Sequence, residues 1–382
     1  MSRIGIDITT LMDEHYSGVS EYTFHLVNEF LRLDKHNQYK FYYNSGRDVS
    51  ARLPVFNEKN VTVTGTRYPN KIFNYVLQKF FYRPQVDRLL GGVEVYWSPH
   101  INFFSLSPSP YKFLTIHDLS FLRYPEFFNC RKNFWHRLID VKKLVNKFDH
   151  LIAVSQSTKN DIVELLGVAP EKVSVIYSGI DSSYFPVVDV EGLDRVRIRY
   201  ELPEKYILYL GNVEPRKNLV GLIRTYNELR DSRPDLSAVK LVIAGATGWK
   251  IGDIFKELEL SAYESDIIFL GYVDKVDKPA IYSLATVFAY PSFYEGFGFP
   301  PLEAMACGTP VVTSNISSLP EIVGSAALTV DPHNVSAIAN ALGQVLSDKN
   351  LALKLRQEGF RQVKQFNWES AAQKYLALFE KK

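Results

Sequence analysis

The sequence has few cysteines and no long apolar run, and each of these features argues against particular classes of protein. The two cysteines, Cys130 and Cys307, lie far apart in 382 residues, without a CxxC partner or a nearby pair of histidines. This favours reduced thiols in a cytosolic protein over a disulfide framework or a zinc site. No charged leader precedes the first apolar residues, and no stretch of about 18 apolar residues follows. We therefore expect a protein that is neither exported nor membrane-spanning.

The sequence also lacks a large excess of charge of either sign, and it lacks several catalytic motifs. The formal net charge of +2 provides no global basic field of the kind that nucleic-acid-binding proteins use, so nucleic acid is not an expected partner. The GxSxG, GxGxxG and GxxxxGKS patterns are absent, and the histidines show no metal-ligand spacing. The sequence therefore lacks the motifs that would best indicate a serine hydrolase, a dehydrogenase, a P-loop NTPase or a metal site.

Short β-branched runs alternate with helical patterns along the chain, which predicts βα units in parallel sheets. A length of 382 residues favours two domains, and we assign residues 1–185 to the first and 186–365 to the second, with a linker within 178–200. The expected strands are residues 3–8, 39–43, 61–64, 93–97, 112–116, 150–154, 173–176, 206–211, 241–245, 267–271, 286–290 and 310–313. The expected helices include 19–33, 131–147, 219–230 and 368–382, with Ser20, Asn129 and Asn218 as candidate caps.

The most informative segment contains two carboxylates, Glu295 and Glu303, eight positions apart. Pro300 and Pro301 suit a first helical turn that needs no N–H donors, and Gly308 suits the left-handed residue after a helix. From the residues alone, Glu303 could simply favour the positive end of its helix while Glu295 is a solvated loop acid. The alternative is a loop that holds a polyhydroxylated, anionic ligand.

The segment GFGFPPLEAMACGTPVV resembles the Glu-x7-Glu signature of the large retaining glycosyltransferase family four, which has the GT-B fold. The resemblance implies an α/β protein with two Rossmann-like domains whose parallel sheets face a central cleft, and a last helix, 366–382, that packs back on the first domain. It implies that Glu303 grips the ribose diol of a nucleotide sugar. It also implies that Glu295, with the backbone of Gly296, Phe297 and Gly298, orients the hexose or supports positive charge at its anomeric carbon.

Two cations, Arg216 and Lys217, precede the helix that Asn218 should cap. Positive charge at the positive end of a helix is unfavourable unless an anion arrives there, although flexible side chains could instead extend into water. The PRKN segment resembles the family's diphosphate-contacting pair, which implies that the enzyme needs no metal cofactor. Asn212 stands where many relatives carry an arginine, so Lys217 is the firmer candidate of the two cations.

Further candidates lie at the expected carboxyl ends of strands. His117 ends a strand and could handle protons or recognise hydroxyls, although an isolated histidine is often purely structural. The resemblance places such a histidine beside the transferred sugar. It also places the nucleotide base against the backbone of Tyr272 and Val273.

Two small residues complete the predicted donor site. Gly18 belongs to a loop, residues 15–20, whose amides could approach a phosphate, although most such loops are only turns. Ser155 ends a strand at a similar rim position. Ser157, as a helix cap, would explain that region almost as well.

Together these features favour a retaining hexosyltransferase that uses a nucleotide-sugar donor and a glycan or lipid-linked acceptor in cell-envelope polysaccharide synthesis. GDP-mannose is the favoured donor because HDLSFLRYPEFF resembles mannosyltransferase sequences. The alternatives are an epimerase on the same fold and a non-catalytic nucleotide-sugar- or glycan-binding protein.

Basic and aromatic residues mixed in 67–88 and 131–147 could contact an anionic bilayer at the inner face of the plasma membrane, or could equally form a solvated face.

Overall fold

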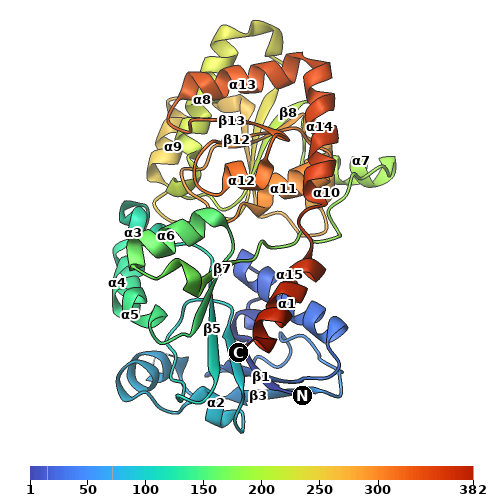
Figure 1. The fold of residues 1–382 in the computed structure, drawn as a ribbon. Helices are drawn as coiled ribbons and strands as arrows, with labels where there is room; N and C mark the ends of the chain where they lie inside the picture. The colour runs from blue at the N-terminus through green and yellow to red at the C-terminus, as the bar shows by residue number, and fades with distance from the viewer. Residues whose placement is uncertain (15, 71, 382) are drawn as a thin grey trace. The chain divides into compact units, whose positions relative to one another are not determined.

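A computed structural model of the protein describes residues 1–14, 16–70 and 72–381, apart from the side chains of Tyr75 and Leu77. His15 of the predicted phosphate loop, Lys71 of the basic segment and Lys382 at the chain end lie outside the described residues. Contacts divide the chain into two units, each built on one parallel sheet flanked by helices (Figure 1). Unit 1 comprises Met1–Leu119, Arg131–Gly179 and Asn367–Lys382, and unit 2 comprises Ser120–Cys130 and Ile180–Phe366.

Unit 1 contains a seven-stranded parallel sheet in the order β3-β2-β1-β4-β5-β6-β7. Its centre is almost wholly apolar: Ile6 of β1 pairs with Phe41 on one side and with Trp97 on the other, and none of the three is exposed. Such fully buried central strands are typical of sheets covered on both faces. The strands are β1 (Arg3–Asp7), β2 (Gln38–Asn44), β3 (Val61–Thr66), β4 (Val95–Ser98), β5 (Tyr111–Ile116), β6 (His150–Ala153) and β7 (Val173–Val175). The helices are α1 (Gly18–Leu33), η2 (Ile72–Phe81), α2 (Val86–Leu89), α4 (Cys130–Ile139), α5 (Val141–Val145), α6 (Gln156–Leu166) and α15 (Trp368–Glu380).

The last helix, α15, packs against α1 in unit 1, where the red and blue helices lie side by side in Figure 1. The hydroxyls of Tyr22 and Tyr375 are 2.5 Å apart and both rings are buried, which explains how the end of the chain is fixed to the first helix. Phe379 on the same helix is also buried.

Two helix-cap predictions and one helix prediction in unit 1 are wrong. Ser17, rather than Ser20, caps α1, because its hydroxyl accepts the Ser20 N–H. Ser155, rather than Ser157, caps α6 by accepting the Thr158 N–H at 3.0 Å. The helix expected at 131–147 is two helices, because Asp140 adopts a left-handed conformation (φ 54°) between α4 and α5 and caps the second.

Unit 2 contains a six-stranded parallel sheet in the order β10-β9-β8-β11-β12-β13. Its strands are β8 (Tyr206–Leu210), β9 (Lys240–Ala244), β10 (Ile267–Gly271), β11 (Val287–Tyr290), β12 (Val311–Ser314) and β13 (Ala327–Val330). Its helices are α3 (Ser120–Arg123), α7 (Val190–Arg199), α8 (Leu219–Ser232), α9 (Gly252–Glu259), α10 (Lys278–Leu284), α11 (Phe299–Ala306), α12 (Leu319–Val323), α13 (Val335–Ser347) and α14 (Lys349–Val363). The sequence did not predict β13, and the expected linker 178–200 contains α7.

None of the described helices combines the length and the apolar character needed to cross a bilayer.

Candidate active site

The candidate site lies in unit 2, where two neighbouring strands of the sheet end. β8 and β11 are hydrogen-bonded neighbours, so the loops after them start at the same edge of the sheet. The loop after β8 leads into a short 3-10 turn, η5 (Pro215–Lys217), and the loop after β11 contains Glu295. This topology explains how residues almost 80 positions apart meet, and a carboxyl edge of this kind is where ligands of open parallel sheets bind.

Local sequence fixes both loops. Asn218 caps α8 by accepting the Gly221 N–H, as predicted, and this places the preceding cations at the helix N-terminus. Gly298 (φ 112°) precedes α11, Pro300 and Pro301 occupy its first turn, and Gly308 (φ 82°) follows it in the left-handed region, as the sequence predicted.

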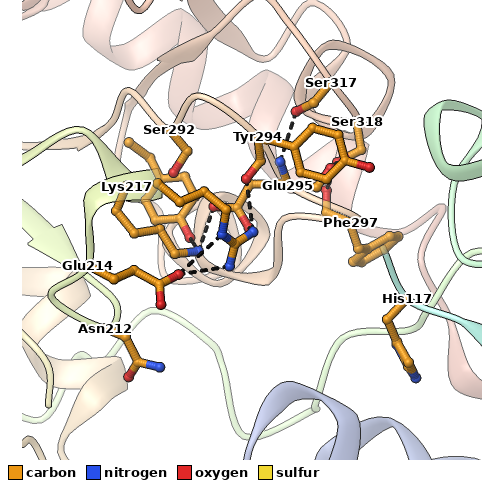
Figure 2. A network of polar contacts seen from close by, with 12 residues as sticks. His117, Asn212, Glu214, Lys217, Ser292, Tyr294, Glu295, Phe297, Ser317 and Ser318 are labelled. Carbon is orange, nitrogen blue, oxygen red and sulfur yellow. Dashed lines mark hydrogen bonds and ion pairs between the residues drawn. The ribbon is translucent and has the colours of Figure 1, made fainter. Parts of the chain in front are cut away.

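Glu295 bridges the two cations (Figure 2). Lys217 Nζ donates to Glu295 Oε1 at 2.6 Å, and Arg216 Nη1 donates to Glu295 Oε2 at 3.1 Å. Lys217 also donates to the Tyr290 hydroxyl at 2.8 Å. Lys217 and Glu295 are each only 7% exposed, so the alternative that the cations extend into water does not hold for Lys217.

Glu214, a residue not predicted from the sequence, completes the network. Its Oε1 accepts from Arg216 Nη2 at 2.9 Å and from Arg216 Nε at 3.2 Å, and its side chain is buried. The signal available in the sequence was an acid two residues before an arginine. Because Arg216 also donates to the Tyr294 carbonyl at 2.9 Å, its guanidinium is held from three directions.

The charges alter the protonation of the network. Burial by itself raises the pKa of Glu295, but Arg216 and Lys217 outweigh burial and hold that pKa at about 2. Burial, followed by the neighbouring Arg216, lowers the pKa of Lys217. At neutral pH Glu295 is therefore a carboxylate that already satisfies two cations.

Two serines fix the backbone of the Glu295 loop. The Glu295 N–H donates to the Ser317 hydroxyl at 3.1 Å, and the Ser318 hydroxyl contacts the Glu295 and Phe297 carbonyls at 3.0 and 2.7 Å (Figure 2). The loop is thus held from behind, while Gly296 and Phe297 lie in its buried part.

Glu303 lies on α11 in the same unit, where its Oε2 accepts from the Tyr282 hydroxyl at 2.8 Å. Its side chain is half-buried. On the same unit, Asn212 is exposed beyond β8 and its carbonyl accepts from the Tyr209 hydroxyl. Beyond β10, the Tyr272 side chain is 51% exposed whereas Val273 is buried.

Three predicted site residues belong to unit 1. His117 follows β5, and its Nε2 donates to the Pro99 carbonyl at 2.7 Å, since a carbonyl oxygen can only accept. Burial lowers the pKa of His117 to about 4, so the ring is neutral at physiological pH and its Nδ1 can accept a hydrogen bond. Gly18 is the first residue of α1, and the buried Ser155 hydroxyl is engaged in capping α6.

Comparison with known proteins agrees with this architecture. The family model described as Glycosyltransferase Family 4 matches residues 16–184, and that of Glycosyl transferases group 1 matches residues 194–362. The chain belongs to the GT-B glycosyltransferases. This glycosyltransferase chain has the fold of Anabaena HepE, solved in complex with UDP and glucose, with a TM-score of 0.73 at 16% identity over 100% of both chains.

Two curated relatives of this glycosyltransferase from Escherichia coli are named mannosyltransferases. It is 36% identical over 266 residues to O-antigen chain mannosyltransferase B, an alignment that spans 67% of this chain and 66% of the relative. It is 32% identical over 250 residues to serotype-specific mannosyltransferase WbdA, spanning 64% of this chain and 30% of the relative. The alignments therefore leave a third of the first relative and most of the second unmatched.

Proposed function

We propose that the chain moves a hexose from a nucleotide-diphosphate sugar to the hydroxyl of a glycan or lipid-linked acceptor in cell-envelope polysaccharide synthesis. The observation that carries this proposal is the buried pairing of Glu295 with Lys217 and Arg216 at the carboxyl edge of the unit 2 sheet. Negative charge grows on the diphosphate as the bond to the sugar breaks. Cations prearranged in a water-poor site stabilise such charge strongly.

Each member of the site has a proposed role. Lys217 and Arg216 bind the diphosphate, while Glu295 and the backbone of Gly296, Phe297 and Gly298 orient the hexose. Glu303 accepts two hydrogen bonds from the ribose diol, because a carboxylate can satisfy both hydroxyls at once.

The remaining predicted residues have supporting roles in this proposal. The base lies against Tyr272 and Val273, with Asn212 near the diphosphate. His117 offers its unprotonated Nδ1 to a sugar hydroxyl. Gly18 remains a candidate phosphate contact through its backbone, whereas the Ser155 hydroxyl is occupied by its helix cap.

We propose mannose, carried by GDP, as the transferred sugar, because the two curated relatives are named mannosyltransferases. We further propose retention of anomeric configuration. Because two cations could neutralise the leaving diphosphate, the reaction needs no metal. Full loss of transfer in EDTA, restored by magnesium, would contradict metal independence.

The deciding experiment is a donor panel that includes GDP-mannose and UDP-glucose, with and without a mannose-terminated acceptor. Release of GDP that requires the acceptor, together with a product whose anomeric configuration matches the donor by NMR, is the expected result. Conversion of the donor sugar without acceptor would identify an epimerase. Binding of donor without any release would identify a non-catalytic binding protein.

We also propose that unit 1 contacts an anionic membrane through an exposed cluster defined by Phe80, Phe81 and Tyr82. The three side chains are 66%, 67% and 50% exposed, and Lys147 Nζ lies 4.3 Å from the centre of the Tyr82 ring. Aromatic side chains beside cations suit the interface of an anionic bilayer. Phe81→Asp should reduce co-sedimentation with phosphatidylserine vesicles, whereas Leu260→Asp, at a side chain of unit 2 that is 73% exposed, should not. Equal binding of both variants would favour a solvated face and a soluble acceptor.

A further inference from the structure

Residues 120–130, here called the strap, connect two parts of unit 1 in sequence but pack with unit 2. The chain leaves β5, passes His117 and forms α3 and the short turn η3 (Pro125–Phe127). It re-enters unit 1 at Arg131. An excursion of this kind needs contacts that compensate for the ordering of its residues.

The contacts of the strap converge on the loop after β11. The Phe127 ring stacks on Phe293, with centroids 5.7 Å apart and planes at 15°, and His333 stacks at 4.8 Å with Phe293 as well. The Tyr124 ring lies 5.7 Å from the ring of Tyr294. Aromatic pairs at such separations typically contribute about 0.5–1.5 kcal/mol beyond their area.

The strap is also anchored by the loop after β9. Trp249 Nε1 donates to the Phe127 carbonyl at 2.7 Å, and the Trp249 ring stacks on Phe128 at 6.0 Å. Lys250 Nζ donates to the Glu126 carbonyl at 2.7 Å. These bonds fix the backbone of the strap, so its aromatic side chains form a defined surface rather than a mobile cover.

Phe293 and Tyr294, which the strap contacts, also hold Arg216 through their backbone. The Phe293 N–H donates to the Arg216 carbonyl at 3.0 Å, and the Tyr294 carbonyl accepts from Arg216 Nη1 at 2.9 Å. Arg216 is therefore clamped at its main chain and at its guanidinium by two consecutive residues, and Glu295 follows them directly. A shift of this dipeptide would move both partners of the Arg216–Glu295 ion pair together.

We propose that Tyr124 and Phe127 are positioning residues for the Arg216–Glu295 pair. They act through the side chains of Tyr294 and Phe293, without touching substrate. This inference rests on the proposed function in one respect, namely that Arg216 acts on the donor diphosphate. The positioning itself does not depend on what the donor is.

The test compares Phe127→Ala and Tyr124→Ala with Leu122→Ala, a matched change on the same strap at a side chain that is 41% exposed. Misplacement of catalytic groups by about 1 Å can cost roughly 100-fold, so we expect a 10- to 100-fold lower kcat for the two aromatic variants. The KM for the acceptor should be unchanged. Phe127→Tyr, which keeps the stacking ring, should restore most of kcat.

A second readout requires no catalysis. Hydrogen exchange of the peptide containing Phe293 and Glu295 should be faster in Phe127→Ala than in wild type, and unchanged in Leu122→Ala. Wild-type exchange and wild-type kcat in Phe127→Ala would overturn the positioning role, as would equal losses in Leu122→Ala. If the wild-type chain transfers no sugar from any donor, the proposed function fails, while the exchange contrast still decides the role of the strap.

Discussion

The two units bury carboxylates in different ways. In unit 1, Asp87 is 2% exposed and accepts from the Ser107 N–H and hydroxyl at 2.8 and 2.6 Å. Asp34 is likewise surrounded by backbone amides and the Tyr39 hydroxyl. In unit 2, the buried Glu214 and Glu295 are paired with cations instead, and Lys217 is the only buried lysine or arginine among the described residues.

The difference distinguishes carboxylates that only stabilise local structure from carboxylates whose cationic partners can also bind an anion. Amide and hydroxyl donors satisfy a carboxylate without leaving a second charge in the core, so such a group stabilises local structure and offers nothing to an anion. An ion network is costly to desolvate, and its cations can exchange one anionic partner for another. The comparison therefore supports the proposal that the cations of unit 2, rather than a group in unit 1, bind the donor diphosphate.

The largest expected effect comes from removing the buried cation. Lys217→Met should lower kcat roughly 1,000-fold, because the diphosphate loses a charge-assisted partner in a water-poor site. Asp87→Asn is the matched change in unit 1 and should lower the melting temperature without changing the KM for the donor. The measurement is steady-state release of the nucleoside diphosphate. A Lys217→Met enzyme with wild-type kcat would make the ion network merely structural.

Glu295→Gln should separate binding from transfer. The change leaves Lys217 and Arg216 short of one carboxylate and should destabilise unit 2 by roughly 3 kcal/mol, the usual scale for a broken buried ion pair. An added nucleoside diphosphate supplies the missing negative charge, so it should raise the melting temperature more than it does in wild type, although transfer is slower. Thermal shift with GDP measures this, and an equal shift in both proteins would show that the cations do not meet the diphosphate.

Much of this site could be predicted from local sequence. Pro300, Pro301 and Gly308 fix the ends of α11, and Asn218 caps α8, because these residues act within one turn of their own position. The pairing of Lys217 with Glu295 follows from the order of β8 and β11 in the sheet, and strand order is not encoded in any short segment. The parallel α/β class was predicted, whereas the partner of each cation was not.

The failures also have physical causes. Ser17 and Ser20 are both good capping residues, and the backbone conformation at Ser17 decided between them. β13 (Ala327–Val330) lies at the edge of its sheet and only Ala327 is buried, so it lacks the fully buried run that marks its neighbour β12. The sequence prediction grouped residues 1–185, but the strap packs with unit 2 through the Phe127–Phe293 stack, a tertiary contact invisible in the strap's own sequence.

Acid should remove the contributions of His117 in unit 1 and Glu295 in unit 2 in different pH ranges. The pKa of His117 in unit 1 falls from 6.5 to about 4 on folding because the ring is buried. The unfolded state therefore takes up that proton first, and stability is lost as the pH falls from 6.5 towards 4. The pKa of Glu295 in unit 2 falls from 4.5 to about 2, so its contribution is present above pH 4.5 and is lost only below that value.

The expected loss is at most about 3 kcal/mol for each group. The free energy of unfolding in urea should be measured above pH 6.5, between pH 6.5 and 4.5, and below pH 4.5. His117→Asn should reduce the loss of stability in the first step, between pH 6.5 and 4.5, and Glu295→Gln should reduce the loss in the second, below pH 4.5. If His117→Asn left the first step unchanged, another group in unit 1 would have to carry it.

The smallest effect should come from the hydrogen bond that orients Glu303. Tyr282→Phe removes the hydroxyl that donates to Glu303 at 2.8 Å, a neutral-to-charged bond whose loss should raise the donor KM several-fold, on the order of 1 kcal/mol. Tyr206→Phe is the matched control in the same unit, because its hydroxyl donates at 2.7 Å to the Ile281 carbonyl rather than to a proposed substrate ligand. Both variants should lose comparable stability, but only Tyr282→Phe should change the donor KM while leaving the acceptor KM as it is. A similar rise in donor KM for the two variants would show that stability alone, and not the orientation of Glu303, controls donor binding at this end of the site.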